Sequence, residues 1–93
     1  MYTYTTEDII RVWQMATIVP AYDASVIRQD RCGAWIKLKD YGNRNSDWGW
    51  EIDHIIPTSR GGSHTLQNVQ PLHWRNNVAK GDGVLTCAIS SAR

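Results

Sequence analysis

The hydrophobic residues near the N-terminus recur at helical spacing. Ile9, Ile10 and Trp13 share one side of a helical wheel, with small or polar residues between them. Thr5 or Thr6 can cap this helix, and the two acidic residues that follow suit the positive end of the helix dipole. We therefore predict an amphipathic helix that ends before the first proline.

The pattern changes further along the first half of the chain. Residues 21–31 mix polar and small side chains with no clear period, which predicts either a second short helix or an irregular segment. Apolar and polar residues then alternate over 35–39, which predicts a strand. Residues 41–47 are dense in Gly, Asn, Ser and Asp and predict a turn.

The second half has the order strand, long loop, strand, helix. Residues 48–56 predict a strand that a proline ends, and 58–68, with its Gly-Gly pair, predicts a loop longer than most. Residues 69–72 are long enough for a short strand that pairs back on the first. Residues 73–80 suit a helix that Gly81 ends. The elements together predict an α+β fold.

Length and composition limit the class of protein. A chain of 93 residues supports one thin hydrophobic core, so we expect a single domain over 1–93. Its net charge of +1 and its lack of a cationic arm do not by themselves indicate a nucleic-acid-binding protein. No apolar run is long enough to cross a membrane, and we expect a cytoplasmic protein. Cys32 and Cys87 belong to no C-x-x-C pair and are expected to be reduced thiols.

Candidate metal ligands lie in the second half. His73 and Asn77 are four residues apart, so a helix would place them on one face, which Lys80 continues. If that helix packs across the two strands, the face meets Asp53, which brings a carboxylate, an amide and an imidazole to one point. This mixed set suits Mg²⁺, Mn²⁺ or a later divalent ion and leaves positions for water and a phosphate oxygen.

His54 is the candidate general base, because an imidazole can be neutral at pH 7 and accept a proton from water. Adjacent strand residues point to opposite faces, so Asp53 and His54 serve one reaction centre only where the strand twists or ends, or where metal and water lie on different sides of the phosphate. The amide of Asn68 can hydrogen-bond backbone on both sides of the long loop.

Other polar residues have separate interpretations. Arg60, Arg75 and Lys80 are near enough in sequence to bind phosphate oxygens. His64, in a Gly-Ser loop, is expected to be an exposed turn residue, and Asn76 a solvated one. Glu51 shares a strand face with Asp53, where it either supports a metal ligand or forms an ion pair with an arginine. This last choice stays open.

These residues carry a resemblance. The stretch 51–57, followed by a Gly-Gly pair and then by Asn68, His73 and Asn77, resembles the motif of HNH endonucleases. The 14 residues from His54 to Asn68 and the 9 from Asn68 to Asn77 match its spacing. Asn as the last letter gives an H-N-N variant, also found in RNA-guided DNA nucleases. The motif core covers 50–82, and the upstream Cys-Gly and Tyr-Gly elements are similar to those of small stand-alone HNH proteins of bacteria and phages.

The resemblance implies a ββα-metal (His-Me finger) nuclease core with an N-terminal helix and an extra strand. It implies a DNA endonuclease that leaves 5′-phosphate and 3′-hydroxyl ends, in which His54 activates water and Asn68 holds the loop. Asp53 and Asn77 would bind one divalent cation, Mg²⁺ or Mn²⁺ first and Zn²⁺ or Ni²⁺ as further candidates. His73 matches a metal-binding histidine of colicin-type HNH nucleases and a zinc-binding cysteine of many others.

The sequence departs from many HNH proteins because it lacks paired C-x-x-C elements, so no structural zinc is expected. Packing of Trp35, Trp48, Trp50 and Trp74 is the expected substitute. Near-neutral charge predicts weak affinity for DNA, so specificity would come from a protein partner, from a homo-oligomer or not at all. The alternative function is a non-catalytic DNA-binding or phage assembly module, and an antibacterial toxin domain would share the nuclease chemistry. The expected setting is the cytoplasm of a bacterium or of a phage-infected host.

Overall fold

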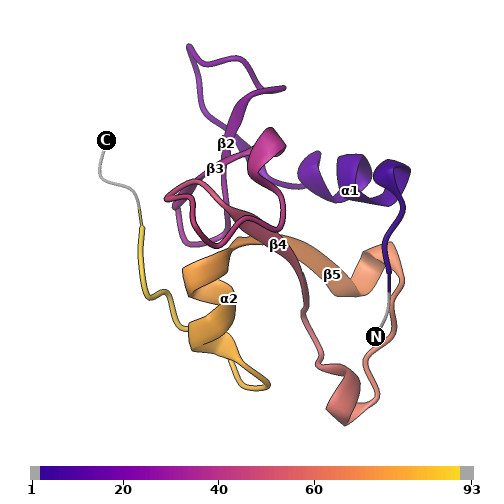
Figure 1. The fold of residues 1–93 in the computed structure, drawn as a ribbon. Helices are drawn as coiled ribbons and strands as arrows, with labels where there is room; N and C mark the ends of the chain where they lie inside the picture. Colours follow the sequence, from indigo (N-terminus) through magenta and orange to yellow (C-terminus); the bar gives the residue numbers. More distant parts are fainter. Residues whose placement is uncertain (1–2, 91–93) are drawn as a thin grey trace.

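The computed structural model describes residues 3–90, which form an α+β fold as predicted (Figure 1). A three-stranded antiparallel sheet has the strand order β1-β2-β3, and a separate antiparallel pair joins β4 to β5. The helices and strands, in chain order, are α1 (Thr6–Trp13), β1 (Thr17–Ile18), β2 (Ile27–Gln29), β3 (Trp35–Lys37), β4 (Trp50–His54), β5 (Val69–His73) and α2 (Trp74–Lys80). In the motif core, the two predicted strands are β4 and β5, the predicted long loop joins them, and the predicted helix is α2.

Helix α1 begins with a reciprocal cap. The hydroxyl of Thr5 accepts from the backbone N–H of Asp8 at 3.1 Å, and the Asp8 carboxylate accepts from the Thr5 N–H at 3.2 Å. Val12 and Trp13 are its buried residues. The helix ends at Trp13, so Ala16 belongs to the following turn.

The structure corrects the expectation for residues 21–31, where a short helix or an irregular segment was predicted. Residues 27–29 form strand β2, which pairs with β3. The expected extra strand is therefore one edge of a three-stranded sheet. Three residues are too few to show an alternating pattern, which is why the sequence did not predict β2. Strand β3 also stops at Lys37, because Leu38–Asp40 forms a 3₁₀ turn.

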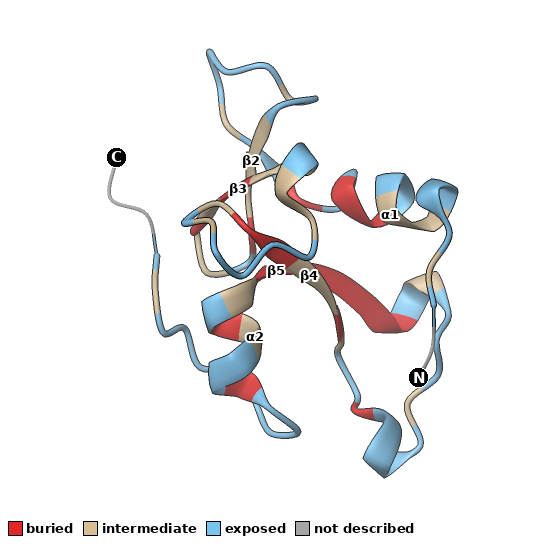
Figure 2. Cartoon of the chain, in the orientation of Figure 1, coloured by how far each residue is buried: buried red, intermediate tan, exposed pale blue. Residues whose placement is uncertain are grey.

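The hydrophobic core lies between α1 and the two sheets. Val12, Ile36, Trp50 and Val69 are among its buried members, and the rings of Trp13 and Trp50 lie 5.4 Å apart. All five residues of β5 are buried, which Figure 2 shows as a continuous stretch of buried ribbon. Strand β5 is thus the central support against which β4 is held in register, with Asp53 opposite Gln70.

A disulfide between Cys32 and Cys87 corrects the expectation of reduced thiols. The two cysteines are 55 residues apart in sequence, so the bond ties the segment after α2 to the turn between β2 and β3. A cross-link over such a long loop restricts the unfolded chain strongly. Disulfides persist mainly in oxidising compartments, so the cytoplasmic location remains only a prediction. No helix within residues 3–90 is long and apolar enough to cross a bilayer.

One buried carboxylate, that of Asp30, joins the two halves of the fold. Its Oδ1 accepts from the backbone N–H groups of Cys32 at 2.9 Å and Ala34 at 2.8 Å. Its Oδ2 accepts from the backbone N–H of His73 at 2.9 Å and from the Asn76 amide at 3.0 Å. Asn76 is fully buried, contrary to the solvated position expected for it. The start of α2 is therefore attached to the β2–β3 turn by hydrogen bonds to a single side chain.

Candidate active site

Asp53 and His54 form the end of β4 and line the same hollow. This hollow has a volume of about 190 Å³, and its lining also includes Asn77 of α2. Because His54 is the last residue of the strand, the chain leaves the extended conformation there and both neighbours reach one space. The structure thus brings three of the predicted site residues together.

The carboxylate of Asp53 is buried and held on both sides. Its Oδ2 accepts from the Gln70 amide at 2.9 Å, and its Oδ1 lies 3.3 Å from the Lys80 ammonium. The ammonium also donates to the backbone oxygen of His54 at 2.9 Å. Lys80 therefore links α2 to the end of β4. It neutralises a carboxylate that would be costly to bury alone.

Asn77 lies one helical turn before the end of α2 and contacts Glu51. Its amide nitrogen donates to Glu51 Oε1 at 2.8 Å, and Arg44 holds the same carboxylate with two hydrogen bonds of 2.6 and 2.9 Å. Burial raises the pKa of Glu51, but hydrogen bonds from Arg44 and Asn77, together with the Arg44 charge, outweigh burial and lower it. Because the amide nitrogen is engaged, the amide oxygen of Asn77 is the atom left for a cation. The ion pair expected as one choice for Glu51 is present.

The imidazole of His54 meets two residues that sequence reasoning did not connect with it. Its Nε2 lies 2.7 Å from Nδ1 of His64 and 3.2 Å from the hydroxyl of Tyr4. Burial lowers the pKa of His54 and the proximity of the His64 ring lowers it further, whereas Asp53 acts in the opposite direction. The shift favours the neutral form of the ring, which is the form that can accept a proton. His64 is exposed as expected, but it contacts His54 rather than solvent alone.

Asn68 fixes the long loop through its side chain. Its amide oxygen accepts from the Ile56 N–H at 2.9 Å, and its amide nitrogen donates to the carbonyls of Ile56 at 3.0 Å and Ser63 at 2.8 Å. These are the backbone contacts predicted for it. Gly62 is required beside it, because a Cβ there would lie 1.7 Å from the Ile56 oxygen. The loop thus closes tightly just after His54.

His73 has a different place from the one predicted. It is the N-cap of α2: its Nδ1 accepts from the Arg75 N–H at 3.0 Å, and its Nε2 donates to the Asp47 carbonyl at 2.8 Å. Both nitrogens are engaged with backbone in a site that is 1% exposed. No lone pair is left for a metal, so His73 is not part of the metal site that we propose below.

The predicted phosphate-binding residues are dispersed. Arg75 is stacked over Trp74 at 5.0 Å and lies 3.6 Å from an Asp47 oxygen. Arg60 is exposed and lines a separate hollow, to which Arg31 and Lys80 also contribute. Arg60 lies within the long loop, whereas Lys80, contrary to its predicted role at phosphate, is buried and paired with Asp53.

A wider hollow of about 540 Å³ adjoins the first one and shares His54, Thr58 and Asn77 with it. Its lining adds the phenol of Tyr41, the guanidinium of Arg44 and the imidazole of His64. Aromatic and cationic groups around a cavity of this size suit a sugar-phosphate segment. His54 and Asn77 thus face both hollows, whereas Asp53 lines only the smaller one.

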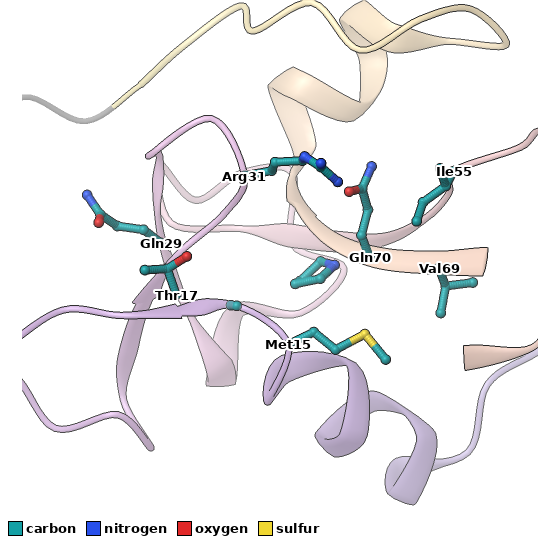
Figure 3. Close-up of a pocket in the computed structure, with 9 residues that line it drawn as sticks. Met15, Thr17, Gln29, Arg31, Ile55, Val69 and Gln70 are labelled. Atoms are coloured by element: carbon teal, nitrogen blue, oxygen red, sulfur yellow. The ribbon is translucent and has the colours of Figure 1, made fainter. Parts of the chain in front are cut away.

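A further hollow, of about 250 Å³, lies between α1, β2 and β5 (Figure 3). Met15, Gln29, Arg31 and Gln70 are part of its lining, and none of them was predicted as a site residue. Gln70 connects this space with the candidate site, because its amide donates to Asp53.

In a comparison with protein families, residues 30–83 match a family model described as HNH endonuclease. The chain belongs to the HNH endonuclease family. The match covers more than half of the 93 residues and includes both the motif core and the β2–β3 turn. Comparisons with curated proteins and with solved structures find no match. The predicted family and fold class are confirmed.

HNH endonucleases typically use a divalent metal ion. Residues 3–90 contain no group of three or more His, Cys, Asp or Glu side chains placed to hold a metal. Asp53 and Asn77, which carry a carboxylate and an amide oxygen, line one hollow of about 190 Å³. Such a sparse oxygen set fits Mg²⁺ or Mn²⁺, which keep several waters and also bind substrate phosphate.

Proposed function

We propose that this HNH protein is a metal-dependent endonuclease that hydrolyses DNA phosphodiester bonds, with His54 as the general base. The observation that supports this proposal is the placement of His54, whose pKa is lowered mainly by burial, in the same hollow as Asp53 and Asn77. A neutral imidazole can take the proton of an attacking water, which is the contribution of a general base to hydrolysis.

The other residues have supporting roles in the proposal. Asp53 and Asn77 would hold the ion, and Mg²⁺ or Mn²⁺ is the expected choice. When bound, the cation supplies charge stabilisation at the phosphate and at the leaving oxygen. Lys80 keeps Asp53 in place, Asn68 closes the loop, and Arg60 contributes a phosphate contact. Products with 5′-phosphate and 3′-hydroxyl ends are expected.

Removal of the metal tests the function directly. We expect the parent protein to relax and linearise supercoiled plasmid in the presence of Mg²⁺ or Mn²⁺, and to lose this activity when EDTA is added. The reason is that the sparse oxygen set holds the ion weakly enough for a chelator to remove it. Agarose gels of a time course measure the conversion. Unchanged cleavage in excess EDTA would contradict the metal-dependent mechanism.

Substitution of Asn77 tests the division of roles. We expect Asn77→Ala to weaken Mn²⁺ binding by roughly tenfold or more, and His54→Ala to change it much less, because Asn77, unlike His54, supplies an oxygen to the cation. Isothermal titration calorimetry with Mn²⁺ compares the two variants with the parent. A larger loss of Mn²⁺ affinity in His54→Ala than in Asn77→Ala would overturn the assignment.

The non-catalytic alternative has no observation in its favour, because Asp53, His54 and Asn77 are all present and line one hollow. DNA is the expected partner. The net charge of +1 still predicts weak binding by this chain alone, so we expect a protein partner or a homo-oligomer to supply specificity.

A further inference from the structure

The loop after β4 brings a second imidazole to the candidate general base. Nδ1 of His64 lies 2.7 Å from Nε2 of His54, and the two rings meet edge to face with centroids 4.8 Å apart. The hydroxyl of Tyr4 faces the same nitrogen at 3.2 Å. In Figure 1 the segment before α1 runs beside this loop. Within the described residues, the two hydrogen-bond contacts of the His54 ring, to His64 and to Tyr4, are thus both made by Nε2.

The backbone on both sides of His64 is held in place. The Ser63 carbonyl accepts from the Asn68 amide at 2.8 Å, and the hydroxyls of Ser63 and Thr65 lie 2.8 Å apart. The loop as a whole is closed by the Asn68 contacts to Ile56. His64 is therefore presented to His54 by an anchored loop, although its own side chain is exposed.

The short distance between the two rings limits where the hydrogens lie. A neutral imidazole carries one N–H and one lone pair, and a hydrogen bond between two ring nitrogens needs one donor and one acceptor. If His64 accepts, the hydrogen of His54 is on Nε2 and the lone pair is on Nδ1. If His64 donates, a neutral His54 carries its hydrogen on Nδ1 and has no lone pair outside this contact.

We propose that His64 is a positioning residue for the general base: it accepts the Nε2 hydrogen of His54 and keeps the proton-accepting lone pair on Nδ1. This inference rests on the proposed function, because it names the ring nitrogen that takes the proton from water. The tautomer of an active-site histidine is set by the partner of its other nitrogen. Here that partner is an imidazole from the loop instead of a carboxylate.

The tautomer itself is measured without any cleavage assay. Long-range ¹H–¹⁵N correlation spectra of the disulfide-intact, metal-free parent protein at neutral pH should show a protonated Nε2 and an unprotonated Nδ1 for His54. In His64→Leu we expect a mixture of both tautomers. In His64→Asn we expect the parent pattern to return, because the asparagine Oδ1 takes the place of His64 Nδ1 as acceptor. Gln67→Leu, an exposed residue of the same loop, is the matched control.

Cleavage kinetics give the second measurement. We expect His64→Leu to lower kcat by roughly 10- to 100-fold with little change in KM, which is the range for loss of a residue that orients another. His64→Asn should recover most of kcat, and Gln67→Leu should match the parent. If His64 had a merely structural role, asparagine at this position would not restore kcat, and the tautomer of His54 would not change in His64→Leu.

Two results would overturn the inference. One is a protonated Nδ1 on His54 in the parent, and the other is an unchanged tautomer and kcat in His64→Leu. Failure of the parent to cleave DNA with any divalent ion would instead reject the proposed function, and the NMR spectra would still decide which ring donates.

Discussion

Replacement of His54 by alanine should lower DNA cleavage by about 10²- to 10⁴-fold, the usual contribution of a general base. The substitution removes the only imidazole of this chain that lines the hollow with Asp53 and Asn77, within the described residues 3–90. It leaves the supports of that hollow in place, because Lys80 hydrogen-bonds the backbone oxygen of residue 54 and not its ring. The loss should therefore appear in the chemical step.

Supercoiled plasmid with saturating Mn²⁺ is the substrate for this comparison. The parent, His54→Ala and the exposed loop variant Gln67→Ala are assayed side by side, with circular dichroism spectra to compare their folds. We expect Gln67→Ala to match the parent, since its side chain is exposed and makes no described hydrogen bond. Equal rates for the parent and His54→Ala would reject His54 as the base.

The motif core was predictable from the sequence because its elements follow from local rules. The apolar run before a proline, the Gly-Gly loop and the helix-compatible segment ended by Gly81 became β4, the loop and α2. Gly62 shows why such residues are informative, since no other residue fits against the Ile56 carbonyl. Strands β1 and β2 were not predictable, because two or three residues show no alternating pattern. The Cys32–Cys87 bond was not predictable because it joins segments 55 residues apart.

The candidate site was predictable only in part, for a related reason. Asp53, His54 and Asn77 belong to adjoining elements, so a correct order of strand, strand and helix brings them near one another. Tyr4 and His64 reach His54 from segments with no periodic pattern. The helix-face argument failed for His73 because α2 begins one residue later, at Trp74, and a cap residue does not share the face of the helix.

The expected substitute for a structural zinc was tryptophan packing, and the rings of Trp35 and Trp48 do pack 5.9 Å apart. The connection between α2 and the upstream turn, however, is made by the Asp30 carboxylate. It is bonded to the backbone of His73 and to the side chain of Asn76, at the beginning of the helix that carries Asn77. The sequence did not predict this role for Asp30, because two of its four donors come from the distant start of α2.

Replacement of Asp30 by alanine should destabilise the fold by about 3 kcal/mol or more, because it leaves three backbone N–H groups and one N–H of the Asn76 amide without their acceptor in a buried site. Urea unfolding of the disulfide-intact protein, followed by tryptophan fluorescence, measures the free energy of unfolding. Asp82→Ala is the matched control, since Asp82 is exposed and makes no described hydrogen bond. A loss of this size is a large fraction of the stability of so small a domain, so Asp30→Ala should also weaken Mn²⁺ binding by loosening α2. Unfolding midpoints that coincide for the two variants would show that the hydrogen bonds of Asp30 do not hold α2 in place.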